Sequence, residues 1–432
     1  MNGSASQLPA DYVSTFEFVH PTHITQTMLD VTDKTAESSP RRGTFWPLTN
    51  EVRPSDIYCY LGARFGHPNG LQNFFRNDDS DNLIHWEWYL KTSIGYITFA
   101  GLNFRTDIWI HGTELPDTEK QSLIGQIKAD FSKYAKEMQH IRRVHLEPWI
   151  EFVNPYQRLR RAIKQLLEEL DALGLNPEAD AMPNLLESED LSRSLDHWRT
   201  RAADYSRAIG LSFGIRAMIP VMAESFVNLL LFLLARTGVK EDKQLFKGIF
   251  RLPMNMRIAS LPYYCTGFEN PVDLNHSAMK DYLKIVDSRN DLLHGNIDIE
   301  KLKFNELYFA GKVPIFNSYS TMWERSLGVA HRAVGLSEVR AELAKVDAFT
   351  DYLTCLLTQN VRDSVEGVSR KFDLGIRKDT GQIGVLFPDH LVDFGMAADQ
   401  PGAAQRAVTI NVIRDGPPEP HDGEQLDGAD RV

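Results

Sequence analysis

The chain has 432 residues, of which 47 are Lys or Arg and 58 are Asp or Glu, and its formal charge is -11 at pH 7. Hydrophobic residues make up 43% and charged residues 24%, which is the composition of a globular protein and excludes a fibrous or wholly disordered chain. The acidic balance argues against a surface that coats nucleic acid, although a local basic site is compatible with it. At about 100–200 residues per domain, the length predicts more than one domain.

The three cysteines, Cys59, Cys265 and Cys355, lie far apart in the sequence and form no CxxC pair. This spacing favours neither a zinc site nor a disulfide framework, so we expect no metal and no cofactor. Residues 1–11 contain no apolar core of a signal peptide. Both observations predict a protein of the reducing cytoplasm.

One apolar stretch, residues 218–235, is near the length of a membrane span. Pro220, Glu224, Ser225 and Asn228 interrupt it. A carboxylate near the middle of a span costs about 3 kcal/mol to insert. The stretch therefore predicts a helix buried in a bundle and not a membrane anchor.

The N-terminal part of the sequence predicts a flexible arm at 1–43 and a small β-containing domain at 46–114. The arm is rich in Ser, Thr and Pro. The domain is aromatic and β-branched, with turn residues between its apolar runs. Its predicted strands are 57–61, 83–90, 94–100 and 106–111.

After Pro116 the apolar spacing becomes helical, and the connections become short. This order predicts a mostly α protein: a helical connector at 115–186 and a helical bundle at 187–360. Short extended segments at 361–396 and a disordered acidic tail at 397–432 follow. The predicted helices are 117–138, 154–173, 187–209, 213–236, 240–250, 275–294, 320–335 and 337–360. The longer predicted connections are 252–274 and 296–318.

Common catalytic signatures are absent from the sequence. It contains no HExxH, no GxxxxGK[ST] and no GxGxxG after a predicted strand. This excludes the easily recognised zincins, P-loop NTPases and dinucleotide enzymes.

The strongest chemical signal is the segment 282–296, YLKIVDSRNDLLHGN. It predicts the end of a helix, with Asn290 and His294 on one face, Arg289 one step round, and Gly295 just past the last turn. We expect Asn290 to share an apolar stripe with Met279, Leu283, Val286 and Leu293.

This grouping suits phosphodiester chemistry. An imidazole accepts or donates a proton, and a guanidinium binds a phosphate and stabilises the charge of the transition state. RNA carries its own nucleophile in the 2′-hydroxyl, so such a reaction requires no metal ion.

The segment from Arg289 to Gly295 resembles the signature of the HEPN superfamily. In that superfamily an Arg, often followed by a polar residue such as Asn, precedes a His by a short gap at the end of a bundle helix. The apolar stretch that contains Glu224 and Asn228 resembles an earlier core helix of the same fold. The resemblance covers about residues 187–340, and the long 296–318 connection departs from it.

The resemblance implies a metal-independent ribonuclease with Arg289 and His294 as the catalytic pair, Asn290 as the positioning residue, and Glu224 and Asn228 in support. It implies a homodimer with a composite site, RNA as substrate, and a role in antiviral defence or stress, with a protein partner such as an antitoxin. Other superfamily members are inactive interaction modules, and this alternative stays open.

Three further groups of residues have a functional and a structural interpretation. Asp78, Asp79 and Asp81 suit a metal site or, more simply, a solvated turn. The aromatic run suits base stacking or, more simply, a sheet core; its members are Trp86, Trp88, Tyr89, Tyr96 and Phe99. The most basic region suits an RNA backbone or, more simply, a charged helix exterior. The weak substrate-binding candidates in this basic region are Arg142, Arg143, Arg158, Arg160 and Arg161.

Overall fold

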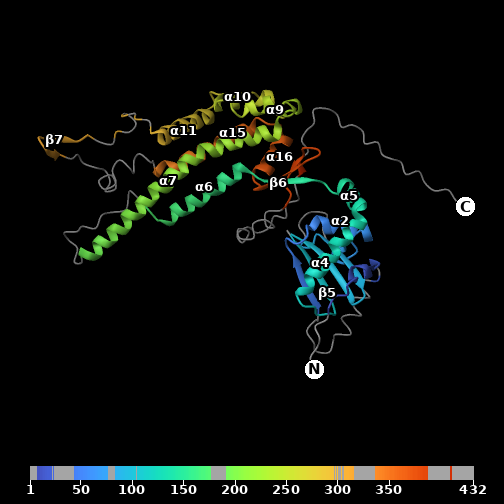
Figure 1. The fold of residues 1–432 in the computed structure, drawn as a ribbon. Coiled ribbons are helices and arrows are strands. Elements are labelled where there is room, and N and C mark those ends of the chain that lie inside the picture. Colours follow the sequence, from blue (N-terminus) through green and yellow to red (C-terminus); the bar gives the residue numbers. More distant parts are fainter. Residues whose placement is uncertain are drawn as a thin grey trace. The chain divides into compact units, whose positions relative to one another are not determined.

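The structure is a computed structural model that describes most of the chain. The described residues are 7–21, 23, 43–75, 83–103, 105–176, 191–295, 297, 299, 303, 306–315, 336–387 and 409–410. The chain divides into two units (Figure 1). The first consists of residues 1–150 with 376–381 and 386–407, and the second of residues 151–375 with 382–385 and 408–432. The protein is mostly α, as the sequence predicts.

An antiparallel five-stranded sheet forms the centre of the first unit, in the order β1-β3-β4-β5-β2. Alternate residues of these strands, among them Trp88, Ile97 and Ile108, enter the hydrophobic core with α2 and α4. The strands are β1 (Glu17–Phe18), β2 (Gly43–Leu48), β3 (Trp86–Thr92), β4 (Gly95–Leu102) and β5 (Arg105–His111). The helices are η1 (Tyr12–Thr15), α2 (Pro54–Phe65), α3 (Gln72–Phe75), α4 (Thr118–Asp130), η2 (Phe131–Tyr134) and α5 (Ala135–Val144).

The strands predicted at 83–90, 94–100 and 106–111 are confirmed as β3, β4 and β5. The strand predicted at 57–61 is wrong, because these residues lie inside α2. Pro54 begins this helix, and Ile57, Tyr60 and Leu61 recur at helical spacing and are buried.

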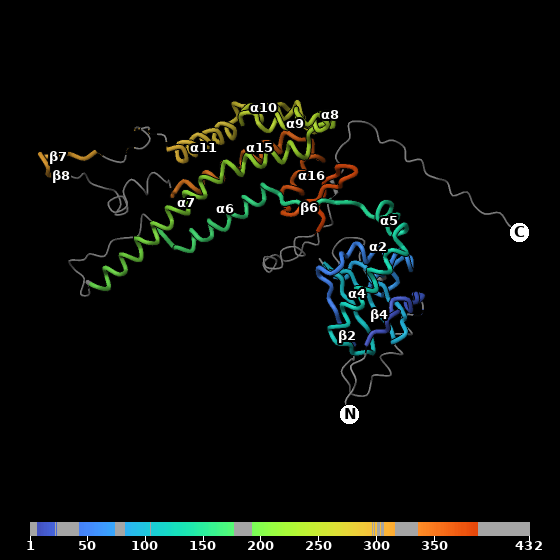
Figure 2. The backbone as a smooth tube through the Cα atoms, in the orientation of Figure 1, coloured from blue at the N-terminus to red at the C-terminus, as the bar shows by residue number. Residues whose placement is uncertain are grey.

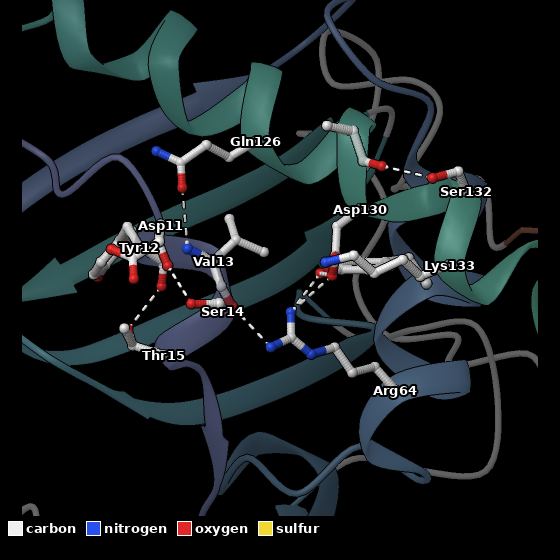
Figure 3. Close-up of polar contacts among 12 residues, drawn as sticks. Asp11, Tyr12, Val13, Ser14, Thr15, Arg64, Gln126, Asp130, Ser132 and Lys133 are labelled. Carbon is white, nitrogen blue, oxygen red and sulfur yellow. Dashed lines mark hydrogen bonds and ion pairs between the residues drawn. The ribbon is translucent and has the colours of Figure 1, made fainter.

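Residues 7–18 do not form the flexible arm that the sequence predicts. Tyr12 and Val13 of η1 are buried in the core of the first unit. The Val13 N–H donates to Gln126 Oε1 at 3.1 Å, and the Val13 carbonyl accepts from Arg64 Nη2 at 2.8 Å. Figure 3 shows Arg64 between this carbonyl and Asp130, to which its Nη1 donates at 3.1 Å. Buried apolar side chains and these polar contacts hold the segment in place, whereas residues 24–42 lie outside the described part of the chain.

A long helix, α7 (Leu191–Leu234), is the central element of the second unit. Figure 2 shows α6 along one side of α7, with α10 and α11 along the other, and α15 also packs on it. The sequence predicts two helices here, 187–209 and 213–236, but α7 is continuous and contains Pro220. The remaining helices are α6 (Pro155–Ala172), α8 (Thr237–Glu241), α9 (Lys243–Ile249), α10 (Met254–Tyr264), α11 (Ser277–His294), η3 (Leu336–Glu338), α15 (Val339–Cys355) and α16 (Gln359–Ser369).

The described helices depart from the predicted segments in two places. The helical connector at 115–186 is not a separate element, because α4 and α5 belong to the first unit and α6 to the second. Helix α10 lies where the sequence predicts a connection, and α16 lies where it predicts extended segments. The helix predicted at 320–335 lies outside the described residues, as does the tail at 397–432 apart from Thr409 and Ile410.

Two small sheets complete the described structure. One has the strand order β11-β10-β9-β6, and the other is the hairpin of β7 and β8. Their strands are β6 (Trp149–Val153), β7 (Tyr308–Ala310), β8 (Val313–Ile315), β9 (Asp373–Arg377), β10 (Ile383–Gly384) and β11 (Thr409–Ile410).

Candidate functional site

Helix α11 carries the residues that the sequence singles out. The His276 side chain caps its beginning, because Nδ1 accepts from the Ala278 N–H at 3.3 Å. Gly295 ends it with φ of 62°, a left-handed conformation that favours glycine. The predicted helix end is therefore confirmed.

The buried face of α11 differs from the predicted stripe. Ala278, Met279, Tyr282 and Ile285 are buried, whereas Leu293 is 42% exposed. In a helix of 3.6 residues per turn, the residue seven positions after Tyr282 lies on nearly the same face. That residue is Arg289, so the guanidinium, rather than Asn290, continues the inward face.

Arg289 is half-buried, and its guanidinium is only partly hydrogen-bonded. Nη1 donates to Asn290 Oδ1 at 2.9 Å. Nε is buried and has no hydrogen-bond partner, and no carboxylate of the described residues forms an ion pair with Arg289. A buried, unpaired donor is unfavourable unless an acceptor reaches it. Nε of Arg257 is unpaired in the same way, but Arg257 has a carboxylate partner. The lack of a carboxylate partner among the described residues is what leaves the Arg289 guanidinium available to an anion.

A second arginine forms an ion pair with the carboxylate of α7 that faces this region. Arg257 of α10 donates from Nη1 to Glu224 Oε1 at 2.8 Å and to Asn228 Oδ1 at 2.9 Å, and its Nη2 donates to the Leu252 carbonyl at 2.9 Å. The structure thus places Glu224 and Asn228, the predicted supporting residues, on one polar cluster with Arg257.

Tyr282 connects this cluster to Arg289. Burial raises the pKa of its hydroxyl, and the charge of Glu224 adds to this effect. The charges of Arg257 and Arg289 oppose it, so all three charges act on the same phenol. The ring of Tyr282 stacks on Phe349 of α15, with centroids 4.2 Å apart.

A third arginine, Arg216 of α7, connects α7 to α11 and α15. It is buried and holds Glu342 with two hydrogen bonds, at 2.9 Å from Nε and 2.5 Å from Nη2. Its Nη2 also donates to Ser288 Oγ at 3.1 Å. Because Ser288 precedes Arg289, this contact fixes the turn of α11 from which Arg289 extends.

His294 lies at the exposed end of α11, in its last turn. It is five positions after Arg289, which corresponds to about 140° around the helix axis. Asn290 is four residues before His294 and shares its side of the helix. Within one chain, the guanidinium thus extends toward the bundle while the imidazole extends toward solvent.

The five arginines of the predicted basic region divide between the two units. Arg142 pairs with Asp56 in the first unit. In the second unit Arg160 Nη1 contacts Asp347 Oδ1 at 2.7 Å, and the Arg161 guanidinium lies 4.3 Å from the centre of the Phe372 ring. Arg143 and Arg158 are exposed. Three of the five therefore have protein partners, which favours the structural interpretation.

The other two candidate groups also have structural roles or fall outside the description. Trp88, Tyr89 and Phe99 are buried, so most of the aromatic run is sheet core, as the simpler interpretation predicts. Asp78, Asp79 and Asp81 lie outside the described residues. Within the part of the chain that the structure describes, no group of three or more His, Cys, Asp or Glu residues could hold a metal ion.

One described helix, Ser192–Leu234, is long and apolar enough to cross a membrane, and 56% of its most apolar window is buried inside the protein. Mostly buried core helices of soluble proteins meet the same criterion, and the contacts of α7 with α6, α11 and α15 are compatible with that role.

Comparison of the chain with known protein families, with curated proteins and with solved structures finds no match.

Arg216, Arg257 and Tyr282 are the residues that sequence reasoning missed. Arg257 lies where the sequence predicts a connection, and Arg216 lies on a mainly apolar helix. For Arg216 the available signal was its position in the apolar part of α7, because a buried charge requires a partner.

Proposed function

We propose that this chain is a metal-independent endoribonuclease of the HEPN type, acting in the cytoplasm as a defence or stress effector. The observation that supports this proposal is the state of Arg289. Its guanidinium is half-buried on α11, is oriented by Asn290 and has no acidic partner among the described residues. A phosphate is the anion that such a planar donor set binds best.

In the proposed reaction, the 2′-hydroxyl oxygen attacks the adjacent phosphorus while the bond from phosphorus to the 5′-oxygen breaks. A base removes the proton of the 2′-hydroxyl, and an acid protonates the departing 5′-oxygen. His294 carries out proton transfer, and Arg289 stabilises the negative charge on the phosphoryl oxygens. The products are a 2′,3′-cyclic phosphate and a 5′-hydroxyl, and no metal ion takes part.

The divergence of Arg289 and His294 supports a homodimer. Because about 140° of helix rotation separates the two side chains, one chain alone does not direct both at the same phosphate. Two copies arranged with their α11 ends together would place the imidazole of one near the guanidinium of the other. In a toxin setting, a protein partner such as an antitoxin would cover this composite site.

A second candidate function is a non-catalytic interaction module. The observation that favours it is the charge of -11, together with the engagement of Arg142 and Arg160 by carboxylates. In this function Arg289 would bind an acidic partner rather than RNA. Expression separates the two functions: an active ribonuclease slows growth of the host and Arg289→Ala relieves this, whereas a module leaves growth unchanged in both cases.

The direct test is cleavage of a mixed RNA substrate by the purified protein in EDTA. We expect cleavage by wild type, and a loss of at least about 100-fold in His294→Ala, the size of effect typical of a missing acid–base group. The matched control is His197→Ala, an exposed histidine near the beginning of α7. If His294→Ala cleaves at the wild-type rate, the proposed role of this residue is wrong.

A further inference from the structure

The hairpin of β7 and β8 exposes apolar side chains on both of its faces. All six strand residues are exposed. Cross-strand pairing places Tyr308 with Ile315 and Ala310 with Val313, which share one face, and Phe309 with Pro314 on the other. The exposed fractions of Tyr308, Phe309, Val313 and Ile315 range from 52% to 64%.

A hairpin of this kind has little stability by itself. An isolated pair of strands is marginal in water, and additional strands or a covering surface are needed to stabilise it. An exposed, contiguous apolar patch of this type marks an interaction site. The exposed apolar residues also continue back along the chain to the end of α11, through Leu307, Ile299, Ile297 and Leu293.

The two edges of the hairpin differ in what they offer to another strand. A two-residue loop, Gly311 and Lys312, joins the strands, so Ala310 and Val313 are hydrogen-bonded to each other. In the next pair, the backbone groups of Phe309 and Pro314 therefore point outward. Pro314 has no N–H, so the β8 edge lacks a donor for another strand. The outward N–H and C=O of Phe309 allow the β7 edge to pair with one.

Charge favours a second copy of the same chain as the partner at this edge. Residues 293–315 contain three acidic residues, Asp298, Glu300 and Glu306, and three basic ones, Lys301, Lys303 and Lys312, so their net charge is zero. Two chains of charge -11 repel each other over most of their surfaces, and a neutral apolar segment is where they can approach. An RNA backbone would require an excess of positive charge, which this segment lacks.

We infer that two copies of the chain join through their β7 edges, forming a four-stranded sheet in the order β8-β7-β7-β8 about a twofold axis. Antiparallel pairing satisfies the outward N–H and C=O of both Phe309 residues. It also gives the hairpin the additional strands that it lacks in one chain. The inference rests on the proposed function only for the expectation of a homodimer, and it requires no catalysis.

The test is the mass of the full-length protein in solution, measured by light scattering over a range of concentrations. Phe309→Pro removes the outward N–H while leaving the hydrogen bonds within the hairpin intact. Phe309→Val is the matched control, because it keeps the N–H and a strand-favouring side chain. Tyr263→Ser controls for the loss of an exposed aromatic residue elsewhere, on α10. Circular dichroism verifies that each variant folds.

We expect dimers for wild type, Phe309→Val and Tyr263→Ser, and a dissociation constant about 30-fold higher or more for Phe309→Pro, since two backbone hydrogen bonds are lost. A monomeric wild type overturns the inference, as does a dimer that Phe309→Pro leaves unchanged. A monomeric wild type whose RNA binding is weakened by Phe309→Pro would make the hairpin an RNA-binding element instead.

RNA cleavage measured on the same samples separates this inference from the proposed function. If Phe309→Pro is monomeric and still cleaves at the wild-type rate, the composite site is wrong and the interface stands. If wild type is a dimer that does not cleave, the interface stands without the ribonuclease.

Discussion

Three arginines of the second unit lie on packed helices but differ in what holds them. Arg216 and Arg257 are buried, and each has a carboxylate partner, Glu342 and Glu224 respectively. Arg289 has only the neutral amide of Asn290. Structural arginines in a bundle are paired because a buried charge is otherwise costly. Arg289, which has no carboxylate partner among the described residues, is therefore the arginine of this unit that suits an anion.

The geometry of the Arg289 guanidinium matters as much as its charge. We predict that Arg289→Lys lowers the rate of RNA cleavage about 100-fold, because an ammonium group cannot reproduce the planar donor set. Arg289→Ala should lower it further. The measurement is single-turnover cleavage in EDTA, with Arg199→Ala, an exposed arginine on α7 paired with Asp196, as the control. Full activity of the lysine variant would contradict bidentate phosphate binding.

His111 makes the stability of the first unit depend on pH. Burial lowers the pKa of this histidine below its ordinary value of 6.5, and Thr98 Oγ1 lies 2.8 Å from its Nε2. As pH falls below 6.5, the unfolded chain therefore takes up a proton that the folded unit resists, and the free energy of unfolding decreases.

We predict that the urea midpoint of the first unit falls between pH 7 and pH 5.5, and that His111→Gln reduces this dependence. Tryptophan fluorescence is the measurement, because Trp46, Trp86, Trp88 and Trp109 belong to this unit. An unchanged pH dependence in His111→Gln would assign the effect to other groups. Glu87 acts in the opposite direction: burial raises the pKa of its carboxyl, so its contribution to stability is lost as pH rises above 4.5.

Local sequence patterns predict an element well when the spacing of its apolar residues and its capping residues specify the structure. The strands β3, β4 and β5 alternate, and α6 and α11 begin and end at recognisable capping residues such as Asn154 and Gly295. Helix α2 was missed because Ile57–Leu61 is a short run with strand-like composition, and burial against the sheet selects the helix. The predicted break between 187–209 and 213–236 does not occur in α7, because tertiary packing outweighs local preference.

The candidate site, too, was predictable only in part from the sequence. Arg289, Asn290 and His294 could be found from one helix end, because spacing along a helix is local information. The orientation of these three side chains relative to the bundle could not be predicted from the sequence. The inward face depends on where α15 and α7 lie, and this places Arg289, instead of Asn290, in line with Tyr282.

At the scale of elements, Asn154 connects two segments that are distant in sequence. Its side chain caps α6 by accepting from the Tyr156 N–H at 3.1 Å, and its Nδ2 donates to the Lys371 carbonyl at 2.9 Å. Its own N–H donates to the Phe372 carbonyl at 2.7 Å. The side chain is fully buried, so losing it leaves backbone groups unsatisfied.

We predict that Asn154→Ala lowers the free energy of unfolding of the second unit by about 2–4 kcal/mol, combining a lost cap with unsatisfied buried groups. Urea denaturation followed by circular dichroism at 222 nm measures this. Asn154→Ser, which can retain the cap, should lose less. Equal losses in the two variants would mean that the cap contributes nothing.

At the scale of the whole molecule, the two units have separate cores and different secondary structure. We therefore predict two unfolding transitions in urea. Tryptophan fluorescence should report mainly the first unit, and circular dichroism at 222 nm mainly the helices of the second. Asn154→Ala should shift only the transition seen by circular dichroism. Coincident curves that Asn154→Ala shifts together would indicate one cooperative molecule.

The chemical nature of the product ends is the sharpest test of the proposal that α11 carries the residues for metal-independent cleavage of RNA. Wild type should be incubated in EDTA with an RNA oligonucleotide and with the same oligonucleotide bearing a 2′-deoxy nucleotide at the mapped cleavage position. We predict 2′,3′-cyclic phosphate and 5′-hydroxyl ends from the first substrate, and no cleavage at that position in the second. Cleavage that requires a divalent metal ion, or that proceeds at the 2′-deoxy position, would contradict the account.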